Sequence, residues 1–350
     1  MLEIDGSRYS GSGTIVRQAV AFAGQTETAV HLVNVRVRRP KPGLRYQHVQ
    51  VVESIRQLVA GTTDGVSPGS REFVFRPGKL RTNPHYTWDI GSAGSTTALA
   101  LALLPVLLFS PNPVSIELRG GLFQDFAPSF YHLENVLLPL LKQMGAEIRA
   151  RMERPGYVPT GGGILSLQVK PLSGKLRPVI LDTPGSVIRL WGMALSSRLK
   201  DQSVSYRMAD SVKRALGAAG HEAEVEVIYD ESSLQPGAGL AVFADLSGGS
   251  RLGSDRAGAP GRRSEAIGKY VARQLLEDLK TGATLDRHAS DQIIPFAALA
   301  AGESAFRIPC LSDHIRSNMW LSEEFLGAKI TAMENRLVVH GVGFEAGSSQ

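Results

Sequence analysis

The chain has 350 residues, 43% of them hydrophobic and 20% charged, with a formal net charge of +5 at pH 7. This length allows a large buried core and more than one domain or repeated unit, and the positive charge suits an acidic partner such as a nucleotide or nucleic acid. Cys310 is the sole cysteine, which excludes an internal disulfide framework and a cysteine-based zinc site.

The longest apolar run, residues 96–109, is too short to span a bilayer and contains Pro105. Residues 1–13 lack the basic region followed by an apolar one that marks a secretory signal. We therefore expect a cytoplasmic protein without a membrane partner.

Hydrophobic periodicity predicts the same order of elements three times along the chain. In the first pass, we expect strands over 2–4, 30–37 and 72–75 and helices over 14–23 and 49–60, in alternation. The second pass predicts helices over 95–109 and 131–144, a strand over 114–118, and strands on either side of 156–163. The third predicts a strand over 178–182, a helix over 291–301, a strand over 305–308, a helix over 318–326 and a hairpin around Glu334.

The third pass is interrupted by a segment with elements of its own. It predicts strands over 204–209, 223–230 and 239–245 and helices over 209–220 and 265–279. The fold class is therefore α+β: three β-α-β-α-β-β modules, each with two helices on a four-stranded sheet, and an inserted small α/β domain. We place the large three-repeat catalytic domain at residues 1–185 and 287–350 and the inserted domain at 186–286.

A basic segment, RVRRPKPGLRYQH (36–48), follows the strand predicted over 30–37. On a strand, Arg36 and Arg38 would share one face and Arg39 would point to the other. Guanidinium groups grip phosphate oxygens bidentately, so the segment indicates a phosphate site. The alternative is a solvated edge strand whose lysine and prolines prevent aggregation.

His314 lies between a predicted strand and a predicted helix, near amide groups that can approach a phosphate. It could act as a nucleophile if one ring nitrogen were free and the other held, or it could simply cap or pack on the helix. Asp286, His288 and Asp291 gather at the start of another predicted helix, where either metal binding or N-capping explains them. Glycine-rich segments over 4–17 and 89–97, each opening a predicted helix, fit either anion binding or close packing.

Taken together, these segments resemble the RNA 3′-terminal phosphate cyclases. The matching motifs lie in order along nearly the whole chain: IDG (4–6), Arg17, RxxRxKPGLxxQH (36–48), FRPG (75–78), IGSAGS (90–95), GYxPxGGG (156–163), SDQ (290–292) and His314. The resemblance implies three repeats like the C-terminal domain of translation initiation factor 3, with a thioredoxin-like inserted domain.

The resemblance also implies an activity. A histidine aligned with His314 would attack ATP to give adenylyl-histidine, AMP would pass to an RNA 3′-phosphate, and the 2′-hydroxyl would close a 2′,3′-cyclic end. The implied cofactors are ATP and Mg²⁺ or Mn²⁺, and the implied partner is RNA with a 3′-phosphate end, with a homodimer left open. The nucleotide-binding positions implied in this chain are Arg17, Arg36, Arg39, Gln47, His288, Asp291 and Gln292.

Several residues depart from the family's pattern. Ser10 stands where the cyclases carry a metal-binding glutamate, so the metal ligands of this chain are unknown, with Asp5 a conceivable substitute. Thr14 and Leu101 each replace a glutamine, and His288 replaces a tyrosine that neighbours the adenine. The alternative function is that of a noncatalytic RNA-binding relative in RNA processing or ribosome biogenesis. Retention of His314 favours the enzyme, and loss of the metal-site glutamate favours the RNA-binding relative.

Overall fold

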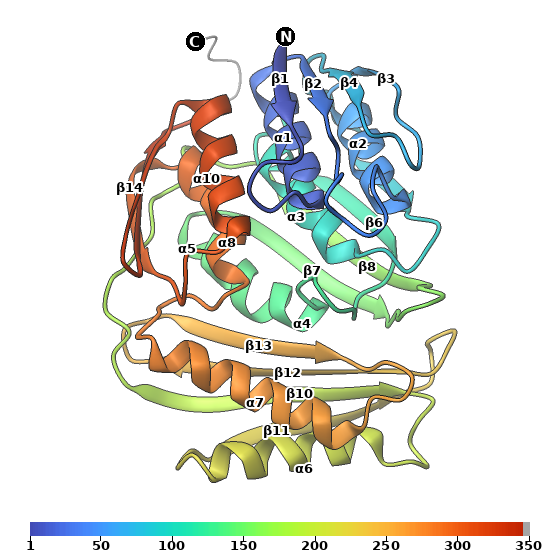
Figure 1. Cartoon of the computed structure of the whole chain (residues 1–350), viewed down its shortest axis with the longest axis vertical. Coiled ribbons are helices and arrows are strands. Elements are labelled where there is room, and N and C mark those ends of the chain that lie inside the picture. The colour runs from blue at the N-terminus through green and yellow to red at the C-terminus, as the bar shows by residue number, and fades with distance from the viewer. Residues whose placement is uncertain (346–350) are drawn as a thin grey trace.

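The computed structural model describes residues 1–345, which form four sheets of four strands with helices packed on them (Figure 1). Three of the sheets belong to the predicted repeats and the fourth to the insertion. Among the described residues, no helix is both long and apolar enough to cross a membrane.

The first repeat has the predicted order β-α-β-α-β-β. Its elements are β1 (Leu2–Asp5), α1 (Gly13–Thr26), β2 (Val30–Val33), α2 (Tyr46–Leu58), β3 (Thr62–Asp64) and β4 (Phe73–Arg76). The sheet has the order β1-β2-β4-β3, with β1 and β2 parallel and the other pairs antiparallel.

The predicted strand over 30–37 is wrong at its end, because β2 stops at Val33. Asn34 and Arg36 adopt left-handed backbone conformations, with φ of 53° and 55°, which a pleated strand does not accommodate. Arg36, Arg38 and Arg39 therefore lie in a loop, and the expected sharing of strand faces does not apply.

The second repeat has the same order. Its elements are β5 (His85–Asp89), α3 (Thr96–Leu107), β6 (Val114–Gly120), a second helix, β7 (Glu147–Arg154) and β8 (Gly163–Lys170). The second helix is continuous and consists of α4 (Phe130–His132), the π-helical turn η1 (Leu133–Leu137) and α5 (Leu138–Gln143). The sheet order is β5-β6-β8-β7.

The third repeat begins with the short strand β9 and resumes after the insertion. Its elements are β9 (Ile180–Leu181), α8 (Ala289–Gln292), α9 (Ile294–Leu299), β14 (Ala301–Arg307), α10 (Asp313–Leu326), β15 (Lys329–Met333) and β16 (Arg336–Val342). Its sheet order, β9-β14-β16-β15, again places the first and third strands of the unit at the edges. The same order in three sheets confirms the predicted repeats.

The insertion forms a sheet with its own helices. Its elements are β10 (Val187–Ser197), α6 (Val204–Gly217), β11 (Ala223–Asp230), β12 (Gly237–Leu246), β13 (Arg251–Ala257) and α7 (Ser264–Lys280), and the sheet order is β11-β10-β12-β13. The boundaries at 186 and 286 and the thioredoxin-like architecture remain predictions.

The strand predicted over 204–209 is wrong, since this segment starts helix α6. Val204, Met208 and Val212 are buried at a spacing of four residues, so the helical period prevails over the apparent alternation in VSYRMA.

The inserted sheet lies between two layers. Helices α6 and α7 cover one face, while the other face meets aromatic side chains of the second repeat. At Gly239 on β12, a Cβ atom would lie 2.5 Å from the Phe123 ring, so the glycine allows the ring to pack directly on the strand. A buried pair, His132 and Asp286, joins α4 to the segment after α7 with its atoms 3.0 Å apart.

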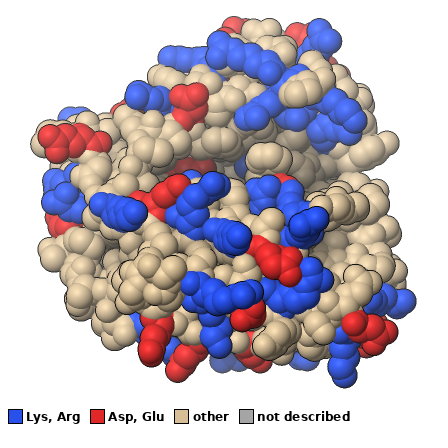
Figure 2. Space-filling model, turned by 60° about the horizontal axis from the view of Figure 1, so that its bottom comes forward, with Lys and Arg blue, Asp and Glu red and all other residues tan. Residues whose placement is uncertain are grey.

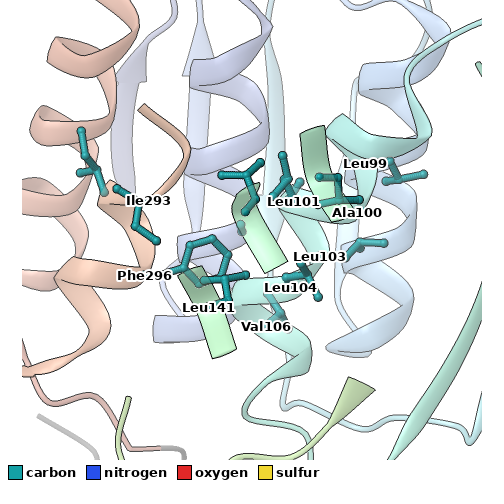
Figure 3. Close-up of a cluster of buried hydrophobic side chains, with 14 of the residues drawn as sticks. Leu99, Ala100, Leu101, Leu103, Leu104, Val106, Leu141, Ile293 and Phe296 are labelled. Carbon is teal, nitrogen blue, oxygen red and sulfur yellow. The ribbon is translucent and has the colours of Figure 1, made fainter. Parts of the chain in front are cut away.

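Helix α1 packs against both α3 and α10, so the helices of the three repeats meet at one centre (Figure 1). Figure 3 shows Leu104 of α3 near Leu141 and Phe296, in one buried cluster with Ile293. Leu101, which replaces a glutamine of the family pattern, is 6% exposed within this cluster. An apolar side chain suits that position because an unpaired amide would be costly there.

Candidate active site

A cavity of about 950 Å³ opens where segments of all three repeats converge. It is lined by the start of α1, the loop between β2 and α2 (34–45, the basic loop), the start of α2, the turn before α3, the loop before α4, α8 and the start of α10. The inserted segment contributes residues 257–259 and the end of α7. All eight predicted site residues line it: Arg17, Arg36, Arg39, Gln47, His288, Asp291, Gln292 and His314. Their proximity in space, from positions almost 300 residues apart, makes one site out of separate motifs; their individual roles remain predictions.

His314 lies in the first turn of α10, whose N-cap is Ser312. Its Nδ1 is 3.0 Å from the hydroxyl oxygen of Thr14 and 3.8 Å from a carboxylate oxygen of Asp291. No hydrogen bond from the described residues reaches its Nε2. This ring nitrogen is the one available to a substrate in the cavity.

Thr14 belongs to the first turn of α1 and also accepts a hydrogen bond of 3.1 Å from Nη2 of Arg17. Burial lowers the pKa of Arg17 to about 10, against the opposite influence of Asp291, so the guanidinium stays charged at pH 7. Gly13, one residue earlier, allows His48 to approach closely, because a Cβ atom there would lie 2.1 Å from Nε2 of His48. The start of α1 thus brings a hydroxyl and a buried cation to His314.

The groups around His314 lower the pKa of its ring, so the ring is neutral at pH 7. Burial lowers the pKa of His314 below its ordinary value; Asp291 opposes this, while Arg17 and Arg39 strengthen it. Burial also raises the pKa of Asp291, against the influence of the histidines and Arg17. A neutral imidazole with one nitrogen held and the other open has the chemistry of a nucleophile.

The basic loop carries cations to the rim of the cavity. Nη1 of Arg36 donates to the carbonyl oxygens of Lys41 and Gly43 at 2.9 and 2.6 Å, and Nη2 of Arg39 donates to the carbonyl of Ser10 at 3.3 Å. Burial lowers the pKa of Arg36, and the neighbouring cations Arg39 and Arg45 add to the effect. Closely spaced cations repel each other, which favours an anion between them.

Helix α2 follows the basic loop and contacts the glycine turn before α3 through a side chain in its first turn. The side-chain oxygen of Gln47 accepts from the Ser95 amide at 3.2 Å. His48 is buried, its Nδ1 accepting from the Arg45 amide at 3.0 Å. Burial and the charges of Arg17, Arg36 and Arg45 lower the pKa of His48 well below its usual range. His48 is therefore neutral and supports the helix start.

The residues before and within α8 favour the capping interpretation over the metal one. Asp286 accepts from the amides of His288 and Ala289, both at 2.9 Å, and pairs with His132. Asn318 of α10 donates to the Asp291 carbonyl at 2.6 Å. Within residues 1–345, no group of three or more histidine, cysteine or acidic side chains is arranged to hold a metal ion.

Comparison with known proteins gives the same family as the motifs. The RNA 3′-terminal phosphate cyclase family matches residues 8–332. The chain belongs to this family. Cyclases named RNA 3′-terminal phosphate cyclase from Staphylothermus marinus and Hyperthermus butylicus are 34% and 39% identical to it, covering 98% and 91% of the chain and 99% and 90% of their own lengths. The relative of that name from Methanopyrus kandleri is 34% identical and covers 94% of each chain.

This cyclase-family chain differs from the family pattern at Ser10. The Ser10 hydroxyl lies 3.0 Å from that of Ser12 and 2.8 Å from that of Ser317, forming a cluster of hydroxyl groups beside α10. Asp5 accepts from the Ser7 amide and from Asn34, and it is not among the described residues that line the cavity. These contacts favour the structural interpretation of Asp5 over its use as a metal ligand.

The sequence did not identify every residue that the structure brings to the cavity. The family resemblance marks Thr14 only as a departure from the pattern, although its hydroxyl contacts His314. Residues 124–128, between β6 and α4, line the cavity and carry none of the recognised motifs. Phe126 among them is fully exposed, whereas the nearby Phe123 and Phe130 are buried, so residue type in the sequence does not single it out.

Proposed function

We propose that the protein uses ATP to convert an RNA 3′-terminal phosphate to a 2′,3′-cyclic phosphodiester, with His314 as the nucleophile. One observation carries the proposal: His314 has Nδ1 held by Thr14 at 3.0 Å and Nε2 open, in a cavity lined by Arg17, Arg36 and Arg39. The curated relatives are named for this activity. Figure 2 shows a face on which many Lys and Arg side chains surround a hollow, in keeping with a polyanionic substrate.

The first step is a displacement at the α-phosphate of ATP. The lone pair of Nε2 forms a bond to the α-phosphorus, the bond to the β-phosphate oxygen breaks, and pyrophosphate leaves. As this bond forms, the ring becomes cationic, and Thr14 and Asp291 stabilise the Nδ1–H side. The arginines stabilise the charge on the phosphate oxygens.

The next two steps transfer and release AMP. An oxygen of the RNA 3′-phosphate attacks the α-phosphorus, the phosphorus–nitrogen bond breaks, and His314 is regenerated. The neighbouring 2′-hydroxyl then attacks the activated 3′-phosphorus, losing its proton to a base, and AMP leaves with the electrons of the broken bond. Covalent catalysis thus divides one difficult condensation into three displacements.

A divalent cation would have few protein ligands here. The Ser10 hydroxyl is engaged with Ser12 and Ser317, and hydroxyl groups bind Mg²⁺ less well than carboxylates do. The described residues therefore do not fit a protein-based metal site, and we propose Mg²⁺ or Mn²⁺ only as the counterion of the ATP phosphates.

The test is covalent labelling of the purified protein with ATP carrying the label at either the α- or the γ-phosphate, followed by a denaturing gel. We expect label from the α-phosphate alone, and none in His314→Ala, whose fold is checked by circular dichroism. Release of the label on addition of 3′-phosphorylated RNA would support the second step. Equal labelling of His314→Ala would overturn the assignment of the nucleophile.

The Ser10 hydroxyl cluster favours one alternative, a noncatalytic RNA-binding relative, because the family's carboxylate is missing from it. That function predicts salt-dependent RNA binding without ATP consumption. The absence of label with either metal, from folded protein that still binds RNA, would support this alternative.

A further inference from the structure

The loop between β6 and α4 presents a bare aromatic ring to the cavity. Phe126 lines the same cavity as His314, and its relative exposure is 101%, the highest among the large hydrophobic residues that the structure describes. Its backbone is left-handed, with φ of 67°, a conformation that bulky side chains rarely adopt. Both features oppose stability, so the surrounding structure must impose them.

The residues on either side of Phe126 are firmly held. Asp125 receives two hydrogen bonds from Arg262, of 2.7 and 3.0 Å, and lies 3.3 Å from Nε of Arg256. Two residues after Phe126, the Pro128 carbonyl accepts from the Thr97 hydroxyl at 2.6 Å. The ring is therefore projected by an anchored turn, and its exposure does not come from a loosely attached loop.

The anchors come from different parts of the molecule. Arg256 lies on β13 and Arg262 lies between β13 and α7, so both belong to the inserted sheet and its connections, while Thr97 is on α3 of the second repeat. Asp255 on β13 also accepts from the Ser129 amide at 2.7 Å. The insertion thus holds the Phe126 turn at the edge of the cavity.

The cavity has room for more than the nucleotide at His314. Its volume of about 950 Å³ lies near the upper end of the range of roughly 300–1,000 Å³ typical of small-molecule sites. A phenyl ring without polar atoms offers its face to a flat partner, and proteins hold unpaired nucleic-acid bases by stacking them on such rings. The cationic residues supply contacts for the phosphates of the same strand.

We propose that Phe126 is a stacking platform for an unpaired base at the 3′ end of the RNA, which it holds in the cavity that contains His314. This inference rests on the proposed function, because it takes the RNA as the substrate of this cavity. A nucleobase could also come from ATP, and the experiment separates the two sources.

The experiment measures binding of a fluorescent 3′-phosphorylated RNA in the absence of ATP, so that no chemistry occurs. The probes are this RNA and a version abasic at its last two nucleotides. We expect Phe126→Ala to weaken binding of the complete RNA roughly 5- to 100-fold, the loss typical of one base–aromatic stack. The abasic RNA should bind the wild type with a similar loss, and Phe126→Ala should weaken it no further.

Two variants serve as controls. Phe126→Trp keeps a stacking face and should bind the complete RNA as the wild type does. Tyr206→Ala removes another exposed aromatic, 60% exposed on α6 and not among the described residues that line the cavity, and should change nothing. Equal binding of the complete RNA by Phe126→Ala and the wild type would overturn the proposal.

Self-adenylylation, which needs only ATP, distinguishes the remaining outcomes. An unchanged ATP dependence in Phe126→Ala supports the assignment to RNA. A raised ATP requirement with unchanged RNA binding would place the adenine on Phe126 and overturn it. If the wild type is never adenylylated but loses affinity for the abasic RNA, the proposed reaction fails while the stacking platform stands.

Discussion

The Thr14 hydroxyl lies between Nδ1 of His314, at 3.0 Å, and Nη2 of Arg17, at 3.1 Å. In the tautomer that leaves a lone pair on Nε2, Nδ1–H donates to Thr14, and Arg17 donates to the same oxygen. The hydroxyl thereby orients the ring and can accept from Nδ1–H in this tautomer, which the Asp291 carboxylate, 3.8 Å from Nδ1, favours. A residue that departs from the family pattern is in direct contact with the proposed nucleophile.

Replacing Thr14 by Val removes this hydroxyl while keeping the branched shape of the side chain. We expect adenylylation to slow by roughly 10- to 100-fold, since a hydrogen bond in a charged network contributes about 1.5–3 kcal/mol. The maximal rate should fall with little change in the ATP concentration for half-maximal rate, because Thr14 contacts the ring. Single-turnover labelling at varied ATP concentration measures both quantities.

Thr14→Ser is the matched control, because it retains the hydroxyl and should recover most of the rate. If Thr14→Ser and Thr14→Val were equally slow, the side chain would serve packing alone.

The low pKa of His314 predicts the pH dependence of adenylylation. Burial lowers this pKa below 6.5, Asp291 opposes the shift, and Arg17 and Arg39 strengthen it. A lowered histidine pKa means that protonation inactivates the nucleophile only below pH 6.5, so the rate should stay above half of its maximum at that pH. Asp291→Asn removes the group that favours the imidazolium. The fall of the rate on the acid side of the pH profile, its acid limb, should therefore move to lower pH.

Rates of label transfer between pH 4.5 and 8, at saturating ATP, test this assignment. Asp313→Asn neutralises a carboxylate next to His314 in sequence, and we expect it to leave the acid limb in place. A limb that moved equally in both variants would show a general charge effect and contradict a specific role for Asp291.

Restoring a carboxylate at Ser10 should restore a protein ligand for the metal. We expect Ser10→Glu to lower the Mg²⁺ concentration for half-maximal adenylylation by about tenfold, since carboxylates bind Mg²⁺ better than hydroxyls do. Loss of the contacts to Ser12 and Ser317 should cost about 1–2 kcal/mol of stability. Metal titrations of the labelling rate provide the measurement.

Ser10→Gln has nearly the same size as Ser10→Glu without its charge. If the two variants showed the same metal dependence, this position would not contact the metal, and the ligands would have to come from the nucleotide.

The repeats were predictable because the pattern of apolar residues marks most of their helices and strands. In α3, the apolar run over 96–109 predicts a buried helix, and the structure gives one over Thr96–Leu107. The strand predicted through Val37 failed because the left-handed conformations of Asn34 and Arg36 come from the loop's tertiary contacts, among them the bond from the Val35 amide to the Arg71 carbonyl.

The site was predictable only as separate motifs. Arg17, Arg36 and His314 were identified by the family resemblance, but their convergence depends on the packing of α1 against α10. The bond from Thr14 to His314 follows from that packing, whereas the ion pair from Asp125 to Arg262 follows from the packing of the inserted segment against the loop before α4. Residue type and spacing along the chain do not specify such contacts, since their partners come from distant elements.

The buried pair of His132 and Asp286 should make stability depend on pH. Burial lowers the pKa of His132, but the Asp286 carboxylate outweighs this and raises it above 6.5; the same pair, with backbone amides, lowers the pKa of Asp286 despite its burial. A raised histidine pKa gives stability that is present below pH 6.5 and lost as pH rises through the folded value. The lowered carboxyl pKa gives stability that is present above pH 3.8 and lost only in stronger acid.

Replacing His132 by Gln should therefore lower the free energy of unfolding by roughly 3–5 kcal/mol at pH 5.5, because it leaves a buried carboxylate without its cation. At pH 9, where His132 is less protonated, the difference from the wild type should be smaller. Urea unfolding at both pH values measures this, with His85→Gln, an exposed histidine, as the matched control. An equal loss of stability at pH 5.5 and pH 9 would mean that packing and the neutral hydrogen bond, not the charge of His132, join α4 to the segment after α7.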